Sequence, residues 1–255
     1  KVADMCTVEI SKMDVKGNVT DMTRVTSKKY TAPSKGSAGE YETWHSIFGD
    51  VLETDGIYKI KITSEDMAGN TSKPLDLTVS VNRYGATYEV VNADAAVAVK
   101  KFKEGLPVNV NTDVVIREVN ATEMSGESTV TIIRNGSETK TLTSRDFDIK
   151  QSRSAGGEGW YENVYTLKNE NFKDDGDYLI NIESADEAGN LNSNNTPVYA
   201  DRKCAVEFSI DKTAPEVIIS GVEEGAVLKD SEVQLRITCS DQNLKKLEEL
   251  SDEEL

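Results

Sequence analysis

Histidine and cysteine are scarce in this chain. The 255 residues include one histidine, His45, and three cysteines, Cys6, Cys204 and Cys239. A zinc site or a catalytic triad would have to be built around that single imidazole, and three widely spaced cysteines fit neither a disulfide framework nor paired zinc ligands. No set of nucleophile, base and oxyanion donor can be named from these residues, so we expect that the protein is not an enzyme.

Positive charge and long apolar runs are also lacking. The 29 lysines and arginines face 45 aspartates and glutamates, and the resulting net charge of -16 argues against nucleic acid as a partner. No apolar run approaches the roughly 18 to 20 residues that a membrane span requires, so we expect no span. The chain opens at Lys1 without a signal peptide, and we expect a mature product or an excised fragment.

The chain contains a tandem repeat. Residues 55–70 align without a gap with residues 175–190, at an offset of 120 positions, and both carry Asp-Gly-x-Tyr-x-Ile followed by Asp-x-Ala-Gly-Asn. After an insertion in the second copy, the alignment continues to Asn82 against Asp201. A repeat of this length corresponds to a whole structural domain and not to one turn of a solenoid.

The repeat predicts where the domains begin and end. Residues 7–10 align with residues 129–132, so the first copy lacks the strands that precede this segment in the second. Residues 214–220 and 232–239 read as two opening strands of a third copy. The predicted parts are an incomplete domain 1–91, a complete domain 92–211, the opening strands of a third domain in 212–243, and an acidic tail 244–255.

The last part of the chain contains the third copy and the tail. The opening strands of the third copy are comparable with residues 97–101 and 113–119 of the second. The tail 244–255 has a helix-forming composition, and Ser251 followed by acidic residues resembles a helix start. Such a helix would be short and marginal, so the tail is either a helix or an exposed end.

Apolar residues alternate with polar ones between regular turn signals. In the first copy Tyr58, Ile60 and Ile62 alternate with Lys59 and Lys61, and the second copy alternates in the same way. Asp-Gly, Asn-Gly and Ala-Gly-Asn turns separate these short segments. A period of two with frequent turns, and without a long helical pattern, predicts an all-β sandwich.

The tyrosine of each Asp-Gly-x-Tyr-x-Ile segment has a predicted structural role. Tyr58 and Tyr178 follow the tight turn, so each ring can be buried while its hydroxyl returns to the backbone of the preceding corner. Two positions later an antibody-type immunoglobulin domain has cysteine, whereas this chain has Ile60 and Ile180. Aliphatic packing is therefore expected in place of the disulfide between sheets.

These paired motifs, together with Ile210-Asp211-Lys212-Thr213-Ala214-Pro215, resemble the tandem bacterial Ig-like domains of cell-surface adhesins and other large exported proteins. The resemblance implies tandem immunoglobulin-like β-sandwich domains, the first and last incomplete. It also implies an extracellular stalk on a bacterial surface, whose partners are the neighbouring Ig-like domains of the same chain. Asp-Lys-Thr-Ala-Pro would mark the junction between domains, although residues 88–94 of the first junction lack Thr-Ala-Pro.

The candidate metal site is for calcium. Oxygen-bearing side chains gather in the repeated loop and at the last junction, and calcium takes six to eight oxygen ligands. In related adhesin arrays, calcium at domain junctions stiffens the rod. The alternative is a plain hairpin, in which aspartate makes an Asx turn and glycine and asparagine adopt positive φ. The candidate ligands are Asp66, Asn70, Asp186, Asn190 and Asp211.

Two functions remain open from the sequence. The first is a structural spacer or adhesive repeat region of an exported bacterial surface protein. The second is a carbohydrate-binding or host-protein-binding module that is accessory to a larger adhesin or enzyme. Tyr41, Trp44 and His45 would form its aromatic surface, although the equivalent Trp160-Tyr161 of the second copy favours core or edge packing.

Overall fold

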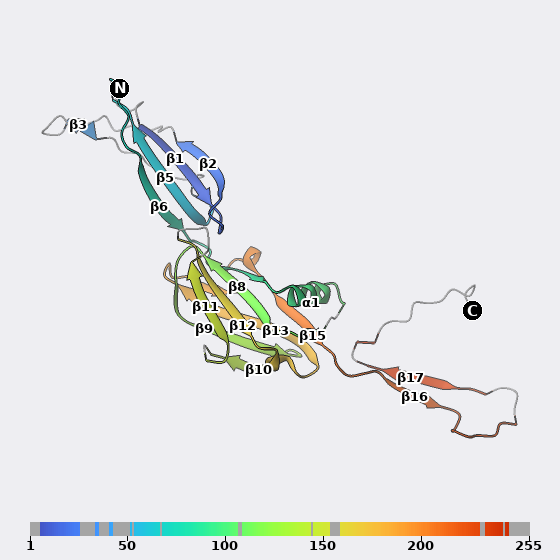
Figure 1. Ribbon diagram of the computed structural model, residues 1–255. Coiled ribbons are helices and arrows are strands. Elements are labelled where there is room, and N and C mark those ends of the chain that lie inside the picture. The colour runs from blue at the N-terminus through green and yellow to red at the C-terminus, as the bar shows by residue number, and fades with distance from the viewer. Residues whose placement is uncertain are drawn as a thin grey trace, which may run out of the picture.

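Strands dominate the described chain. The computed structural model describes residues 6–25, 34–35, 41–42, 52, 54–66, 68–106, 109–143, 145–153, 159–229, 233–241 and 243–244. Within these ranges, antiparallel sheets and one α-helix form an N-terminal unit, a central unit and a C-terminal hairpin, which follow one another along the chain (Figure 1). The all-β class predicted from the alternating pattern is confirmed.

The N-terminal unit (described residues of 6–81) is built on one antiparallel sheet in the order β2-β1-β5-β6. Alternation on its two central strands gathers Val8, Ile10, Tyr58 and Ile60 into one buried cluster. A separate short pair, β3–β4, is also described. The strands are β1 Cys6–Met13, β2 Val19–Val25, β3 Ser34–Lys35, β4 Tyr41–Glu42, β5 Gly56–Ser64 and β6 Leu75–Val81.

The central unit (residues 86–210) has two antiparallel sheets. One has the order β11-β12-β8-β7, and the other has the order β10-β9-β13-β14 with β15 also paired to β13. The strands of the first sheet are β7 Thr87–Val90, β8 Val114–Asn120, β11 Asp148–Arg153 and β12 Tyr161–Leu167. Those of the second are β9 Met124–Arg134, β10 Ser137–Leu142, β13 Gly176–Asp186, β14 Leu191–Ser193 and β15 Val206–Ile210.

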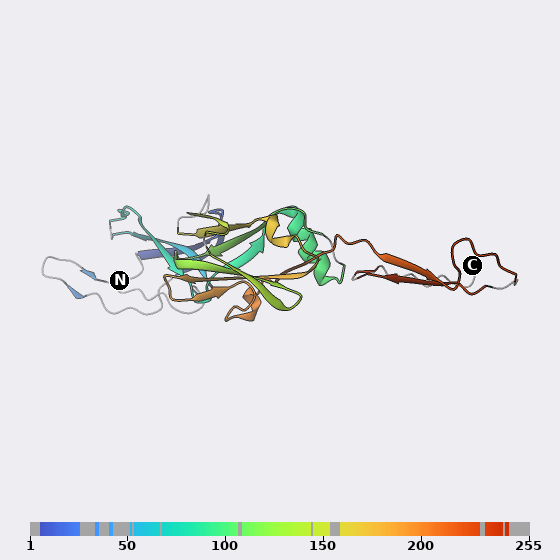
Figure 2. The same ribbon diagram turned by 90° about the horizontal axis from the view of Figure 1, so that it is seen from below.

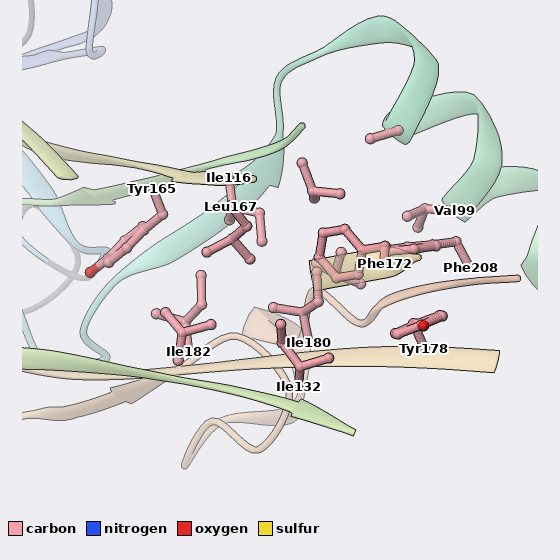
Figure 3. Packing of buried hydrophobic residues seen from close by; sticks show 14 of the residues in the cluster. Val99, Ile116, Ile132, Tyr165, Leu167, Phe172, Tyr178, Ile180, Ile182 and Phe208 are labelled. Atoms are coloured by element: carbon pink, nitrogen blue, oxygen red, sulfur yellow. The ribbon is translucent and has the colours of Figure 1, made fainter. Parts of the chain in front are cut away.

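The two sheets of the central unit share one apolar core. Ile116 and Leu167 of the first sheet lie in the same buried cluster as Ile132 and Ile180 of the second (Figure 3). Near one end of this core Phe172, in the 3-10 turn Asn169–Phe172, packs edge-on against Phe208 at 5.2 Å between ring centroids. A second 3-10 turn, Ala200–Arg202, precedes β15. Aliphatic and aromatic side chains therefore fill the space between the two sheets.

A helix that the sequence did not predict lies beside this core. α1 Ala93–Lys103 contacts β15 and buries Ala95, Ala98 and Val99. Because two of these three residues are alanines, the helix face packs closely without the large apolar residues that would have made its period of 3.6 visible. In the described part of the chain, no helix has the length and apolar character needed to cross a membrane.

The C-terminal hairpin pairs β16 Glu216–Ser220 with β17 Arg236–Ser240. It extends away from the central unit in both views (Figures 1 and 2). β16 begins five residues after Asp211, as β7 begins five residues after Asn82, so Ile219 and its partner Ile237 take the positions of Val90 and Ile116. The predicted counterpart 97–101 was therefore wrong, since that segment belongs to α1.

Strand pairing also corrects one predicted boundary and one predicted alignment. β7 pairs with β8, so the N-terminal unit ends at Val81 and not at the predicted residue 91. In the register, Gly56 pairs with Val81 as Gly176 pairs with Ile210, so the residue equivalent to Asn82 is Asp211. The alignment of Asn82 with Asp201 was wrong, because β14 and the 3-10 turn Ala200–Arg202 make the insertion in the second copy longer.

Both predicted tyrosine corners are present. The Tyr58 hydroxyl donates to the Thr54 carbonyl oxygen at 2.6 Å, and the Tyr178 hydroxyl donates to the Asp174 carbonyl oxygen at 2.7 Å. The two tyrosines are 3% and 4% exposed. Each hydroxyl therefore satisfies a carbonyl of the corner while the ring fills the core, as the sequence predicted.

A buried acidic residue links the two sheets of the central unit. Glu118 is fully buried and accepts hydrogen bonds from the hydroxyls of Tyr88 (2.8 Å), Tyr165 (2.6 Å) and Ser184, and from the Asn163 amide (3.1 Å). Burial, followed by the nearby Glu118 carboxyl, raises the pKa of Tyr88 and of Tyr165. The tyrosines therefore remain protonated donors, and the network is satisfied without a cation.

Replacing Glu118 is expected to destabilise the central unit. Glu118→Leu would leave three hydroxyls and one amide without their acceptor, and each buried unsatisfied group costs about 1–3 kcal/mol. We expect the free energy of unfolding, measured by urea denaturation, to fall by at least about 4 kcal/mol. The control is Glu89→Leu on the neighbouring strand, where an ion pair with Arg117 is half exposed and a change of under about 1 kcal/mol is expected. Equal losses in both variants would contradict the role of the network.

Candidate functional site at the junction of the two units

The linker between the N-terminal and central units is held by Asn82, which follows β6. Its side-chain amide donates to the Asn120 side-chain oxygen (2.6 Å), the Thr122 hydroxyl (2.7 Å) and the Asp186 carboxylate (3.0 Å). Its own oxygen accepts from the Gly85 N–H at 3.0 Å, which closes the turn that follows. One residue of the linker thus binds three elements at the end of the central unit.

Asp186, the last residue of β13, is the acceptor at the centre of this junction. It is 3% exposed, and its carboxylate accepts N–H groups from Asn82, Asn120 and Asn190. Burial raises the pKa of Asp186, but the hydrogen bonds donated by Asn120, Asn190 and Asn82 outweigh burial and leave that pKa below its ordinary value. The junction therefore holds a carboxylate that is stable as an anion although it is buried.

A second carboxylate, that of Asp55, clamps the other side of the linker. It accepts the backbone N–H groups of Arg83 and Tyr84, both at 2.8 Å. Arg202 reaches the same carboxylate from the central unit, with Nη2 at 3.3 Å from Asp55 Oδ2 and Nη1 donating to the Gly85 carbonyl oxygen at 3.0 Å. The side chains of Arg202 and Asp55 are only 18% and 6% exposed, so the ion pair is poorly screened by solvent.

Aromatic rings complete the Arg202 contact. The guanidinium lies 5.6 Å from the centroid of the Tyr84 ring, and that ring meets Tyr199 edge-on at 4.5 Å. At a separate contact between the units, the indole N–H of Trp160, which precedes β12, donates to the carbonyl oxygen of Met13 at the end of β1, at 3.3 Å. These contacts tie the N-terminal unit to the central unit at several separate points.

Gly85 is required where the linker enters the central unit. It has φ of +77°, and a Cβ there would lie 2.1 Å from Asn192 Oδ1. That oxygen accepts the N–H of Ala86 at 3.0 Å, so the close approach of backbone and amide is part of the junction. A side chain at position 85 would have to displace Asn192.

The repeated Asp-x-Ala-Gly-Asn segments form similar five-residue loops, each closed by its aspartate and asparagine. In the first, the Asp66 carboxylate accepts the N–H groups of Ala68 and Asn70 at 2.9 Å, and the Asn70 side-chain amide at 2.8 Å. Gly69 has positive φ as predicted, but among the described non-glycine residues only Asn135 does, so the prediction for the asparagines was wrong. The loop is the Asx turn that the sequence offered as the alternative to calcium.

A third loop of the same construction was missed. Asp14 accepts the N–H groups of Lys16 and Asn18 and the Asn18 side-chain amide, at 2.8–2.9 Å. The signal in the sequence was the aspartate four residues before Asn18, which matches Asp66 and Asp186 once the alanine is dropped from the motif. The hydrogen bonds from the asparagine lower the pKa of Asp14 and of Asp66.

The candidate calcium ligands do not fit a calcium ion in this arrangement. The carboxylate oxygens of Asp66 and Asp186 accept N–H groups, and the amide nitrogens of Asn70 and Asn190 point at them. Asp211 follows Ile210, which pairs with the first residue of β13, whereas Asp186 is the last. Ten residues of strand separate the two levels by roughly 33 Å. Among the described residues, no group of three His, Cys, Asp or Glu side chains could hold a metal ion.

The aromatic candidates fall almost entirely outside the described residues. Tyr41 is in β4, paired with Lys35, and its side chain is not described. Trp44 and His45 lie outside the described residues. The equivalent Trp160 of the central unit is a contact between units, since its N–H donates to Met13.

The chain matches no protein-family model and no curated protein.

Acid should weaken the junction through Asp186. Because the folded-state pKa lies below the ordinary value of about 3.9, its stabilising effect is complete above that pH and is lost as the pH falls through the folded-state pKa. At pH 7, Asp186→Asn should lower the free energy of unfolding by about 1.5–3 kcal/mol. When unfolding is measured from pH 7 to pH 3, the difference in the free energy of unfolding between the variant and the wild type should shrink below about pH 4. A constant difference would mean that the charge of Asp186 does not matter.

Proposed function

We propose that the chain is a spacer: tandem Ig-like β-sandwich domains of an exported bacterial surface protein, which transmit length and stiffness through rigid junctions. The observation that carries this proposal is the pair of aspartates at the first junction. Asp186 and Asp55 hold the linker from both sides, and the bonds include buried charged groups. The sequence resemblance to bacterial adhesin repeats supports the same function and an extracellular location.

The junction resists rotation for a physical reason. Turning the N-terminal unit would break the Asn82 and Asp55 hydrogen bonds and leave the carboxylate of Asp186 short of donors in a site that is 3% exposed. A buried charged group that loses its donors costs more than the 1–3 kcal/mol of a neutral one. The unit ends are therefore locked by polar groups that have no equally good arrangement at another angle.

The charge of the chain fits a solvated rod. A net charge of -16 gives neighbouring copies a repulsive potential, which opposes lateral association. At the same time, the acidic groups at the junction face N–H donors and not each other. The mechanism we propose is mechanical: each unit adds length, and each junction keeps the direction of the previous unit.

Small-angle scattering tests the proposal. The wild-type chain should scatter as one extended shape, and Asp186→Ala should broaden the distance distribution and lower the melting temperature of the N-terminal unit. Asp66→Ala is the matched control. It removes the aspartate of the equivalent five-residue loop in the N-terminal unit, where the side chain is exposed and lies away from the junction. It should leave the scattering unchanged. Flexible scattering by the wild type, or equal broadening in both variants, would contradict a rigid junction.

Calcium provides a second arm of this experiment. Because the loop oxygens already accept N–H groups, millimolar calcium is expected to leave the melting temperature of the wild type within about 1 °C, whereas a ligand present at a hundred times its Kd would add about 2.7 kcal/mol of stability. A calcium-dependent rise that is lost in Asp186→Asn would show instead that the junction rearranges around a metal.

A further inference from the structure

The second junction repeats the plan of the first. Strand register makes Asp211 equivalent to Asn82, and Lys212 and Thr213 equivalent to Arg83 and Tyr84. The aspartate of the Asp-Gly turn does the same work at both: Asp175 accepts the N–H groups of Lys212 at 2.9 Å and Thr213 at 3.1 Å. Asp55 accepts those of Arg83 and Tyr84.

The partner across the junction is also repeated. The registers of β7–β8 and β16–β17 place Asn243 at the position of Thr122. Asn82 donates to the Thr122 hydroxyl, and Asp211 accepts from the Asn243 amide at 2.8 Å. The linker residue is the donor at the first junction and the acceptor at the second, but the same two positions are hydrogen-bonded in both.

The two junctions differ in which group supplies the third hydrogen bond to the aspartate. At the first, Tyr84 offers no hydroxyl near its backbone, and Arg202 supplies the third donor to Asp55. At the second, the Thr213 hydroxyl itself donates to Asp175. This hydroxyl, followed by the Lys212 N–H, lowers the pKa of Asp175.

We propose that Arg202 is the positioning residue of the first junction and substitutes for the threonine hydroxyl found at the second. The residues at positions 84 and 213 determine which group supplies the third hydrogen bond to the aspartate. A threonine there closes the junction within the linker, whereas a tyrosine makes closure depend on the 3-10 turn before β15 of the next unit. This inference rests on the proposed function, since it assigns the residues that make the junction rigid.

Amide hydrogen exchange in the full chain tests the assignment, because it reports local opening at the clamped N–H groups. Arg202→Ala should reduce the protection of the Arg83 and Tyr84 amides roughly tenfold, which corresponds to about 1.4 kcal/mol. The Lys212 and Thr213 amides in the same sample should not change and serve as an internal control. Thr213→Val, which keeps the branched shape, should have the reverse effect. The amides of Lys212 and Thr213 should lose protection, and those of Arg83 and Tyr84 should not.

The decisive variant is Tyr84→Thr combined with Arg202→Ala. If the threonine hydroxyl replaces the guanidinium, Arg202→Ala should cost less than twofold in protection when threonine occupies position 84. A tenfold loss in that background would overturn the proposal, and so would unchanged protection in Thr213→Val. Unchanged exchange of the β9 and β13 amides shows that the variants are folded.

The two proposals fail in different ways. If the wild type scatters as a flexible chain while the exchange pattern holds, the clamp is real but does not make a rod. If scattering shows a rod while Arg202→Ala leaves the amides protected, the rod does not depend on Arg202.

Discussion

A carboxylate surrounded by N–H groups is the interaction on which the junctions of this molecule depend. Asp55 and Asp175 cap the linkers that leave their units, and Asp186 gathers asparagine amides from both sides of the first junction. Each carboxylate acts as a fixed point because a partly buried anion cannot give up its donors without a large penalty. The position of each unit relative to the next follows from where these aspartates lie at the ends of the strands.

This arrangement explains how an acidic chain with few cysteines can make firm connections. Exposed ion pairs contribute about 0–1 kcal/mol, whereas hydrogen bonds to charged groups contribute roughly 1.5–3 kcal/mol. Asp55 and Asp186 lie where backbone and side-chain amide N–H groups converge. The side chain of Asp55 is 6% exposed, and residue Asp186 is 3% exposed. Most of the other acidic residues can then remain on the surface and keep the chain solvated.

The predictable parts of the structure are those set by residues close in sequence. The tyrosine corners follow from Tyr58 and Tyr178 being two positions after Asp-Gly, and the bonds return only four residues back. The missed parts need distant partners: Arg202 meets Asp55 across 147 residues, and Asn82 meets Asp186 across 104. α1 was missed for another reason, because alanines bury its face and leave no strong apolar period.

The comparison of equivalent positions separates the ends of the units from their cores. Glu118 and Tyr88, which form part of the buried polar network, correspond by register to Cys239 and Val217 of the hairpin. Both hairpin residues are exposed, so the described hairpin has no counterpart of this buried network. At the ends, in contrast, Asp55 and Asp175 accept the same two backbone N–H groups in both units. A core requires only that its volume is filled and that its buried polar groups are hydrogen-bonded, and many combinations of residues meet these conditions. A junction must match a particular backbone, and this requirement keeps the same chemistry at each unit end while the interiors differ.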